Sequence, residues 1–297
     1  MDWISGMQKA IDYMEEHLTE EISMEAVAAQ SFSSSYHFQR VFTILCGFSV
    51  GEYLRNRRLS LAGTELATTD QKVIDIALKY GYESPDSFAK AFHRFHGILP
   101  SQARDRQQQL KSFSRLVLKI SLEGGSIMNY RIENKPEMVL VGYKRRFTGT
   151  PAERVQQEGD FYIATRTNQY ILKGLTHDCA TTNNVMTNFG EDGYDFYIAG
   201  QYEGDWKKEL DACDTDRFET IVIPAGQYVI CETDKSRYPT MEFEGVRKKM
   251  ISEWLPSSGY ELAEAPELSV YHWFYEKGND AVNHSRYIEL WIPVTKA

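Results

Sequence analysis

The stretch Ser34-Ser-Tyr-His-Phe-Gln-Arg-Val-Phe-Thr-Ile-Leu-Cys-Gly47 has the residue spacing of an amphipathic helix. Its apolar residues recur at intervals of three and four, which places them on one helical face: Phe38, Val41, Phe42 and Leu45. Ser33 or Ser34 can cap the first free backbone N–H groups, and Gly47 can end the helix in a left-handed conformation. The stretch therefore predicts a helix with one buried face.

The same pattern returns fifty residues later, where Phe88 and Phe92 repeat Phe38 and Phe42, and Gly97 repeats Gly47. One apolar stripe indicates only a helix that faces a core. A repeated stripe with repeated caps and basic outer positions indicates two helix-turn-helix units, each with a short first helix, over residues 23–30 and 72–81. A helix over residues 50–67 is expected to join them. It would be about 27 Å long, close to the ~34 Å between successive major-groove segments.

The net charge of −9 is unevenly distributed along the 297 residues. Residues 1–120 carry 14 basic and 14 acidic residues, so the whole excess of acid lies in residues 121–297. This second part would repel DNA and attract a cationic ligand. No apolar run approaches the ~18 residues of a membrane span, and Met1-Asp-Trp3 lacks the basic start of a signal segment. We therefore expect a cytoplasmic protein with no membrane partner.

Metal and disulfide chemistry have little support in the sequence. The four cysteines are widely spaced and form no C-x-x-C pair: Cys46, Cys179, Cys213 and Cys231. His93 and His96 could share a metal ion, but a third ligand is missing from the sequence around them. We expect both histidines to be exposed, and we expect neither a metal nor another cofactor.

The second helical unit carries the motif Ala77-x-x-x-Gly81-Tyr-x-Ser84-x-x-x-Phe88-x-Lys90-x-Phe92-x-x-x-x-Gly97-x-x-Pro100-Ser101-x-x-Arg104. This motif resembles the DNA-binding domain of the AraC/XylS family of bacterial transcription regulators, over about residues 5–107. The first unit also resembles the single-chain activators of that family. The resemblance implies that both recognition helices enter the major groove. The side chains assigned to DNA are Ser34, Tyr36, Gln39 and Arg40 in the first unit, and Ser87, Lys90 and Arg94 in the second.

Base reading is expected mainly from the first unit. Gln39 can pair with adenine and Arg40 with guanine, because each side chain can form two hydrogen bonds to the base edge. The second unit departs from the family, which often has polar donors where this chain has Pro85 and Asp86. An acid near phosphates is unfavourable, so the second unit is expected to read bases less.

The chain changes character after a serine- and glycine-rich stretch, residues 112–128, which we interpret as a linker. Strand-like runs then occupy residues 138–143, 194–198, 220–223, 228–231, 269–275 and 287–292. Helical segments are expected over about residues 158–172 and 240–255. Strands and a helix, followed again by strands and a helix, predict a duplicated α+β unit with helices on one sheet face.

The last predicted strand has two different faces. Ile288, Leu290 and Ile292 should point to one side, and Tyr287, Glu289 and Trp291 to the other. A carboxylate between two large aromatic rings suits a cation, because the rings attract it and the acid neutralises it. The alternative is a structural acid at a sheet edge, satisfied by hydrogen bonds.

Three further motifs occur in this part: Pro224-Ala-Gly-Gln-Tyr228, Glu253-Trp-Leu-Pro-x-Ser258-Gly-Tyr260-Glu-Leu262 and Glu289-Leu-Trp-Ile-Pro293. Residues 129–295 resemble the GyrI-like, or multidrug-regulator, effector-binding domain. The resemblance implies two β-α-β-β repeats with a pocket between them that binds hydrophobic cations, and a buried acid in the last strand, here Glu289. Candidate pocket walls are Tyr287, Trp291, Tyr228, Tyr197, Tyr271 and Trp273. A few relatives of this domain are hydrolases.

These observations predict a multidomain chain with α and α+β parts. Residues 1–111 form an all-α double helix-turn-helix domain, residues 112–128 a linker, and residues 129–297 a duplicated β-α-β-β effector-binding domain. The predicted function is a transcription regulator that binds double-stranded promoter DNA, senses an aromatic or cationic small molecule and works with RNA polymerase. We expect no enzymatic activity, because the sequence lacks a Ser-His-Asp order, a phosphate loop and a metal cluster. The alternative is a drug-sequestering or hydrolytic protein that acts through the second domain.

Overall fold

The computed structural model describes residues 3–105, 108–118, 128–149, 151–190, 193–210, 214, 216–274 and 277–296. The chain divides into a helical unit, mainly residues 1–123, and a unit built on a sheet, mainly residues 124–297. Residues 119–127 of the predicted linker lie outside the described residues, as do Cys213 and Tyr275. None of the helices in the described ranges combines the length and the hydrophobicity needed to cross a membrane.

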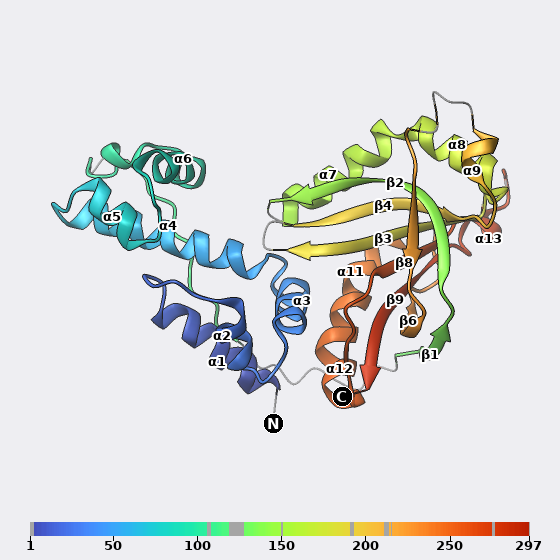
Figure 1. Ribbon diagram of the computed structural model, residues 1–297, viewed down its shortest axis with the longest axis horizontal. Helices are drawn as coiled ribbons and strands as arrows, with labels where there is room; N and C mark the ends of the chain where they lie inside the picture. The colour runs from blue at the N-terminus through green and yellow to red at the C-terminus, as the bar shows by residue number, and fades with distance from the viewer. Residues whose placement is uncertain are drawn as a thin grey trace. The chain divides into compact units, whose positions relative to one another are not determined.

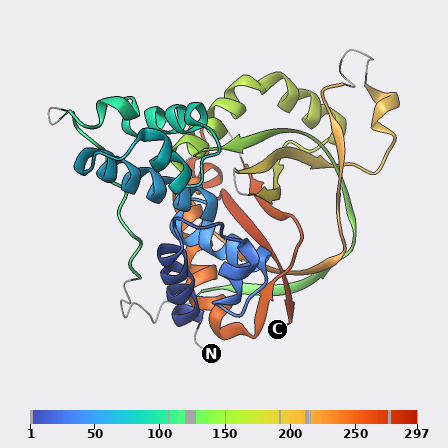
Figure 2. The ribbon, with the colours of Figure 1, turned by 60° about the vertical axis from the view of Figure 1, so that its left-hand side comes forward.

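The helical unit confirms the prediction of two helix-turn-helix units. Its elements are α1 (Trp3–Glu16), α2 (Met24–Ala29), α3 (Ser35–Cys46), α4 (Val50–Thr68), α5 (Val73–Lys79), α6 (Pro85–His96) and the 3-10 turn η1 (Pro100–Gln102). The pair α2–α3 forms the first unit and α5–α6 forms the second. Figures 1 and 2 show α4 running from one pair to the other within this unit.

Local sequence sets the ends of both recognition helices. Ser34 Oγ accepts from the backbone N–H of His37 at 3.1 Å, and Ser84 Oγ accepts from that of Ser87 at 3.2 Å. Gly47 and Gly97 follow the last turns with φ of 80° and 84°, a left-handed conformation that glycine adopts without strain. The predicted caps and stops are thus confirmed.

The second helical pair packs against α4 around Phe88 and Phe92, which are fully buried. Gly63 allows the close approach, because a Cβ atom there would lie 2.7 Å from the His96 ring. The prediction that His96 is exposed is wrong. Its side chain is buried, Nε2 lies 3.0 Å from the carbonyl of Leu59, and Nδ1 accepts from the backbone N–H of Lys111 at 3.2 Å. His93 is exposed as expected.

The segment after η1 is held against the helical unit. The backbone N–H of Phe113 donates to Ser60 Oγ at 3.0 Å, and its carbonyl accepts from Arg57 at 2.6 Å. The backbone N–H of Leu116 donates to the hydroxyl of Tyr53 at 3.1 Å. The first residues of the predicted linker are therefore bound to α4 rather than free of it.

Within its described residues, the second unit contains one nine-stranded sheet with the order β1-β6-β9-β8-β3-β4-β2-β5, in which β7 also pairs with β9. The paired strands are antiparallel. The strands are β1 (Tyr130–Lys135), β2 (Met138–Thr148), β3 (Thr181–Gly190), β4 (Gly193–Gln201), β5 (Glu219–Ile223), β6 (Gly226–Glu232), β7 (Tyr260–Leu262), β8 (Glu267–His272) and β9 (Tyr287–Lys296). The helices are α7 (Pro151–Ala164), α8 (Arg166–Thr176), α9 (Trp206–Glu209), α11 (Thr240–Lys249), the π-helical turn η2 (Met250–Trp254), α12 (Leu255–Ser258) and α13 (Asp280–Asn283).

The strand order reveals the predicted duplication. One repeat is β2, α7 with α8, β3 and β4, and the other is β6, α11 with α12, β8 and β9. In the sheet the repeats appear as β6-β9-β8 and β3-β4-β2, so that corresponding strands are arranged in mirrored order about the β8–β3 junction. The first predicted helix begins earlier than expected and breaks at Thr165 into α7 and α8.

Helices from both repeats cover the same face of the sheet (Figure 1). On this face, Phe161 of α7 and Leu172 of α8 pack with strand residues such as Phe147 and Ile198. The other face has its own apolar cluster, which includes Leu140, Tyr197, Tyr228 and Leu268, with Trp291 packed against it. The two faces therefore carry separate sets of candidate residues.

Candidate functional site

The second recognition helix, α6, presents a polar face. Ser87, Lys90 and Arg94 are exposed, while Phe88 and Phe92 on the opposite face are buried. The Ser87 hydroxyl donates to the carbonyl of Ser84 at 2.8 Å, so it also belongs to the helix cap. The exposed face can offer two basic side chains to a phosphate backbone or to base edges.

The first recognition helix, α3, differs from this arrangement. Ser34 is exposed, whereas Tyr36 and Gln39 are half-buried, and the Gln39 amide donates to Ser35 Oγ at 3.0 Å. Arg40, which the sequence assigned to a DNA base, is buried, with only 5% of its surface accessible. Ile44, one turn further along, is also buried, although both residues lie on the side of α3 opposite Phe38 and Phe42; the helix is therefore covered on more than one side.

The 19 residues of α4 set the spacing within the helical unit. At ~1.5 Å per residue, the helix is about 28 Å long. Successive major-groove segments on one side of DNA lie ~34 Å apart. A rigid helix of this length can connect two recognition helices that enter adjacent groove segments.

In the second unit, Glu289 lies in β9 and is only 9% exposed. The strand register confirms that Tyr287, Glu289 and Trp291 share one face. Cross-strand pairing also places Tyr228 of β6 and Tyr197 of β4 on that face. Tyr271 and Trp273 belong to the opposite face, covered by helices, because Tyr271 is the register partner of Ile288. The structure thus separates these two from the other candidate pocket walls.

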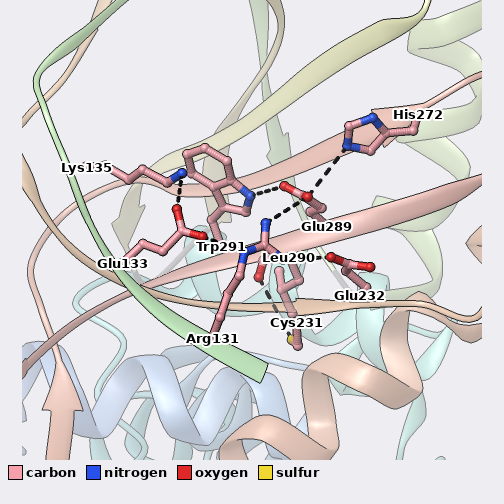
Figure 3. Close-up of polar contacts among 9 residues, drawn as sticks. All are labelled: Arg131, Glu133, Lys135, Cys231, Glu232, His272, Glu289, Leu290 and Trp291. Atoms are coloured by element: carbon pink, nitrogen blue, oxygen red, sulfur yellow. Dashed lines mark hydrogen bonds and ion pairs between the residues drawn. The ribbon is translucent and has the colours of Figure 1, made fainter. Parts of the chain in front are cut away.

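The carboxylate of Glu289 is already hydrogen bonded (Figure 3). The indole Nε1–H of Trp291 donates to Oε2 at 2.8 Å, and Arg131 Nη2 donates to Oε1 at 2.8 Å. His272 Nε2 lies 3.9 Å from Oε1, beyond hydrogen-bond distance. Glu289 is therefore a nearly buried acid that accepts a charge-assisted hydrogen bond from Arg131 and a hydrogen bond from the Trp291 indole, and an imidazole lies close by.

Arg131 of β1 bridges three carboxylates. Its Nη2 donates to Glu289, as described above. Its Nε donates to Glu133 at 2.6 Å, and its Nη1 donates to Glu232 at 2.6 Å. Lys135 contacts the other Glu133 oxygen at 2.5 Å and lies 4.3 Å from the centre of the Trp291 ring. Ion pairs with Lys135 and Arg131 lower the pKa of Glu133. Figure 3 shows these side chains converging from β1, β6 and β9.

This contribution of β1 was not predicted from the sequence. A signal was present, because Arg131, Glu133 and Lys135 alternate along Tyr130–Lys135 with the period of a strand. Alternating charges of both signs indicate one polar face. Nothing local, however, reveals that this face lies beside a carboxylate 158 residues further along the chain.

Two other groups on this face are buried without a hydrogen-bond partner among the described residues: the Tyr228 hydroxyl and His272 Nε2. Burial raises the pKa of Tyr228 to about 12, so the phenol stays neutral and keeps its proton. The His272 ring stacks on Tyr287 with centroids 4.2 Å apart, and the Tyr228 ring lies 6.1 Å from that of Trp291. Unsatisfied polar groups and aromatic rings thus surround Glu289.

A second polar cluster lies on the face covered by helices, where the two repeats meet. Asn184 of β3 and Ser269 of β8 are register partners and nearly inaccessible. The Tyr162 hydroxyl donates to Asn184 Oδ1 at 2.7 Å, but Asn184 Nδ2 and Ser269 Oγ are unsatisfied within the described part of the chain. Burial and repulsion by Glu244, opposed by Arg247, raise the pKa of Glu158 to about 7. This cluster is a second place where an acid and tyrosines meet.

Within the described ranges, no group of three or more His, Cys, Asp or Glu side chains is arranged to hold a metal ion. The described cysteines are free thiols, with Cys231 buried, Cys46 intermediate and Cys179 exposed. Burial raises the pKa of Cys231 to about 12, so this thiol stays protonated.

Comparison with known proteins relates each unit to a family. Residues 27–106 match the helix-turn-helix domain family, and residues 131–294 match the integron-associated effector binding protein family. The HTH-type transcriptional activator AarP of Providencia stuartii is 46% identical over 100 residues, which cover 34% of this chain and 74% of AarP. The regulatory protein SoxS of Escherichia coli K12 is 36% identical over 100 residues, which cover 34% of this chain and 94% of SoxS.

Among solved structures, SAV2435 bound to tetraphenylphosphonium aligns with a TM-score of 0.43 and 16% identity, covering 57% of this chain and 94% of that one. The family matches agree with the order of units found here, helical first and sheet-based second. The chain therefore belongs to the AraC-type helix-turn-helix transcriptional regulators and carries an integron-associated effector-binding domain, so that it is a DNA-binding transcription regulator that senses a ligand.

Proposed function

We propose that the effector is a hydrophobic cation that binds at Glu289, on the sheet face opposite the helices. The observation that carries this proposal is a nearly buried carboxylate flanked by the rings of Trp291 and Tyr287. Aromatic faces attract a cation, and a sheltered acid neutralises it more strongly than an acid in water does. Tyr228 supplies a further ring, and Tyr197 lies further along the same face. The excess of acid in residues 121–297 adds a long-range attraction for cations.

The proposed DNA contacts lie on both recognition helices. On α6 they are Lys90, Arg94 and Ser87, which are exposed, and on α3 they are Ser34, Tyr36 and Gln39. Arg40 is left out because its side chain is buried. We place the DNA-binding function in residues 1–111, the linker in residues 112–128 and the effector function in residues 129–297. The protein would work in the cytoplasm with RNA polymerase and without a membrane partner.

We propose no enzymatic activity for the pocket. Both oxygens of the Glu289 carboxylate already accept a hydrogen bond, one from Trp291 and one from Arg131. The cluster around Glu158 is the second candidate location for the same ligand. It is favoured by the two buried, unsatisfied polar atoms of Asn184 and Ser269.

Calorimetric titration of the full-length chain with tetraphenylphosphonium tests the site. Triphenylphosphine oxide, which is aromatic but neutral, is the reference ligand. Glu289→Gln should weaken binding of the cation at least about tenfold and leave binding of the neutral ligand nearly unchanged, since only the cation loses an ion pair. Glu158→Gln tests the second candidate location in the same way. Loss of cation binding in Glu158→Gln but not in Glu289→Gln would move the site to the face covered by helices.

The regulatory output is tested with a labelled duplex that the full-length chain selects from a random-sequence library. Anisotropy titrations with and without tetraphenylphosphonium measure the coupling between the two units. A change in DNA affinity, lost in Glu289→Gln, supports a sensor. Cation binding that leaves DNA affinity and transcription in vitro unchanged would support a drug-sequestering protein instead.

A further inference from the structure

Glu289 is not an empty cation site, because a cation of the protein already occupies it. The Arg131 guanidinium directs Nη2 to Glu289, Nε to Glu133 and Nη1 to Glu232, at 2.8, 2.6 and 2.6 Å. All three contacts are charge-assisted hydrogen bonds, which are stronger than bonds between neutral groups. Any cation that reaches the Glu289 carboxylate therefore competes with Arg131.

The charge of this cluster becomes more negative when Arg131 leaves it. Arg131 and Lys135 face three carboxylates, those of Glu133, Glu232 and Glu289 (Figure 3). A second full cation beside Glu289 would meet both Arg131 and Lys135 at close range. If Arg131 leaves, the three acids regain room for a positive charge, and the Trp291 ring remains beside it.

The position of Arg131 makes its departure feasible. Its side chain is 38% exposed, and β1 is an edge strand whose one neighbour among the described strands is β6. The guanidinium can therefore move into solvent without opening the core. Glu289, by contrast, stays in place because β9 is paired on both sides, with β6 and β8.

We infer that Arg131 is an internal counter-ion that the effector must displace, and that it thereby selects cations carrying several N–H donors. An aromatic amidinium or guanidinium can replace the hydrogen bonds that the three carboxylates lose. A cation without N–H groups cannot, and it leaves those acids without a donor, which costs binding free energy. This inference rests on the function proposed for Glu289 and adds the class of ligand to it.

Displacement also makes a quantitative prediction for variants. A ligand that needs Arg131 to move binds only the small fraction of molecules in which the arginine has left, so its measured affinity is lowered by that fraction. Replacing Arg131 by methionine keeps an apolar stem of similar length and removes the competitor. The penalty then disappears for a cation without N–H groups.

The test compares pentamidine, an aromatic diamidine, with tetraphenylphosphonium by calorimetry on the full-length chain. The unmodified protein should bind pentamidine more tightly than tetraphenylphosphonium. Arg131→Met should tighten tetraphenylphosphonium at least about tenfold and reduce the preference for pentamidine. Arg166→Met, which removes an exposed arginine at the start of α8, is the matched control and should change neither affinity.

Arg131→Lys provides a second variant if Arg131→Met fails to fold. A lysine keeps the charge but replaces the planar guanidinium, which contacts three carboxylates, by a single charged point. The affinity for tetraphenylphosphonium should therefore also rise in Arg131→Lys, but by a smaller factor than in Arg131→Met. Unchanged or weaker tetraphenylphosphonium binding in the Arg131 variants, together with lost binding in Glu289→Gln, would overturn the inference and leave the proposed site intact. Affinities that Glu289→Gln does not change would overturn both.

Discussion

The guanidinium of Arg57 on α4 contacts the carboxylate of Glu15 on α1 at two points. Nε donates to Oε1 at 2.8 Å, and Nη2 donates to Oε2 at 2.7 Å. The Tyr53 hydroxyl donates to Oε1 at 2.6 Å, while Arg57 Nη1 donates to the carbonyl of Phe113 at 2.6 Å. One acid thus organises α1, α4 and the segment after η1.

Glu15→Ala should destabilise the helical unit by about 3 kcal/mol, because it leaves a mostly buried guanidinium and a tyrosine hydroxyl without their acceptor. Hydrogen exchange of α1 and α4 amides in the full-length chain measures this loss locally. Glu16→Ala removes the exposed neighbouring acid and is the control. Equal exchange in the two variants would show that the Glu15–Arg57 pair adds no stability.

Glu15 should also make the helical unit sensitive to acid. Burial opposes its ionisation, but hydrogen bonds from Arg57 and Tyr53 outweigh burial and lower the pKa of the carboxyl. The folded state therefore binds this proton less readily than the unfolded state. The stability that Glu15 contributes is present above its ordinary pKa and is lost as the pH falls through the lowered value. Hydrogen exchange of α1 from about pH 6 to about pH 3 should show this loss, and Glu15→Gln should remove it.

Gly63→Ala should destabilise the second helix-turn-helix unit, although alanine is about 1 kcal/mol more favourable than glycine inside a helix. The added Cβ would lie 2.7 Å from Cε1 and Nε2 of His96. The ring is held at Leu59 and Lys111, so overpacking should cost about 1–3 kcal/mol. Gly174→Ala in α8 is the control, because its Cβ meets nothing within 4 Å and should stabilise. Hydrogen exchange of the amides around each position measures whether the substitution stabilises or destabilises the protein there.

Features of the sequence that act locally predicted most of the helical unit. The repeated stripe, the serine caps and the two glycines fix where α3 and α6 begin and end, and these depend on residues a few positions apart. The alternation in β9 likewise predicted that Glu289 and Trp291 share a face. Periodicity carries this information because it is a property of one element.

Features that depend on partners distant in the sequence were missed. β3 begins Thr181-Thr-Asn-Asn184, a polar run without strand periodicity, and it is a strand because β4 and β8 pair with it on both sides. Tyr271 was named with Tyr287 and Trp291 as a candidate pocket wall, but the register with β9 places it on the opposite face of the sheet. The contact between Arg131 and Glu289 joins strands at opposite ends of the domain sequence. Register and strand order are set by tertiary packing, which no single segment encodes.

Lys90→Ala should weaken binding of the selected duplex and lower its dependence on salt. An exposed lysine on the polar face of α6 is placed to neutralise a phosphate, and each phosphate contact contributes ~0.9 to the slope of log affinity against log salt. Anisotropy titrations at several salt concentrations measure both quantities. Lys9→Ala, an exposed lysine on α1, is the control. An unchanged slope would remove Lys90 from the DNA contacts.

Glu158 should give the second unit the opposite dependence on pH from that of Glu15. Burial, reinforced by repulsion from Glu244 and opposed by Arg247, raises the pKa of Glu158 to about 7. The folded state then binds this proton more tightly than the unfolded state, so the unfolding free energy falls as the pH rises from about 4.5 to about 7. The expected loss is about 1–2 kcal/mol, since a raised carboxyl pKa costs ~1.4 kcal/mol per unit and the side chain is partly exposed.

Glu158→Gln should remove this pH dependence and stabilise the second unit at neutral pH, because the amide has no charge to desolvate. Hydrogen exchange of α7 and β3 at several pH values in the full-length chain measures the effect, and Glu261→Gln, at an exposed position of β7, is the control. If exchange in α7 and β3 depends on pH equally in all three proteins, Glu158 is ionised without cost in the folded state. The cluster around Asn184 would then lack the desolvated acid that makes it a second candidate for the cation site.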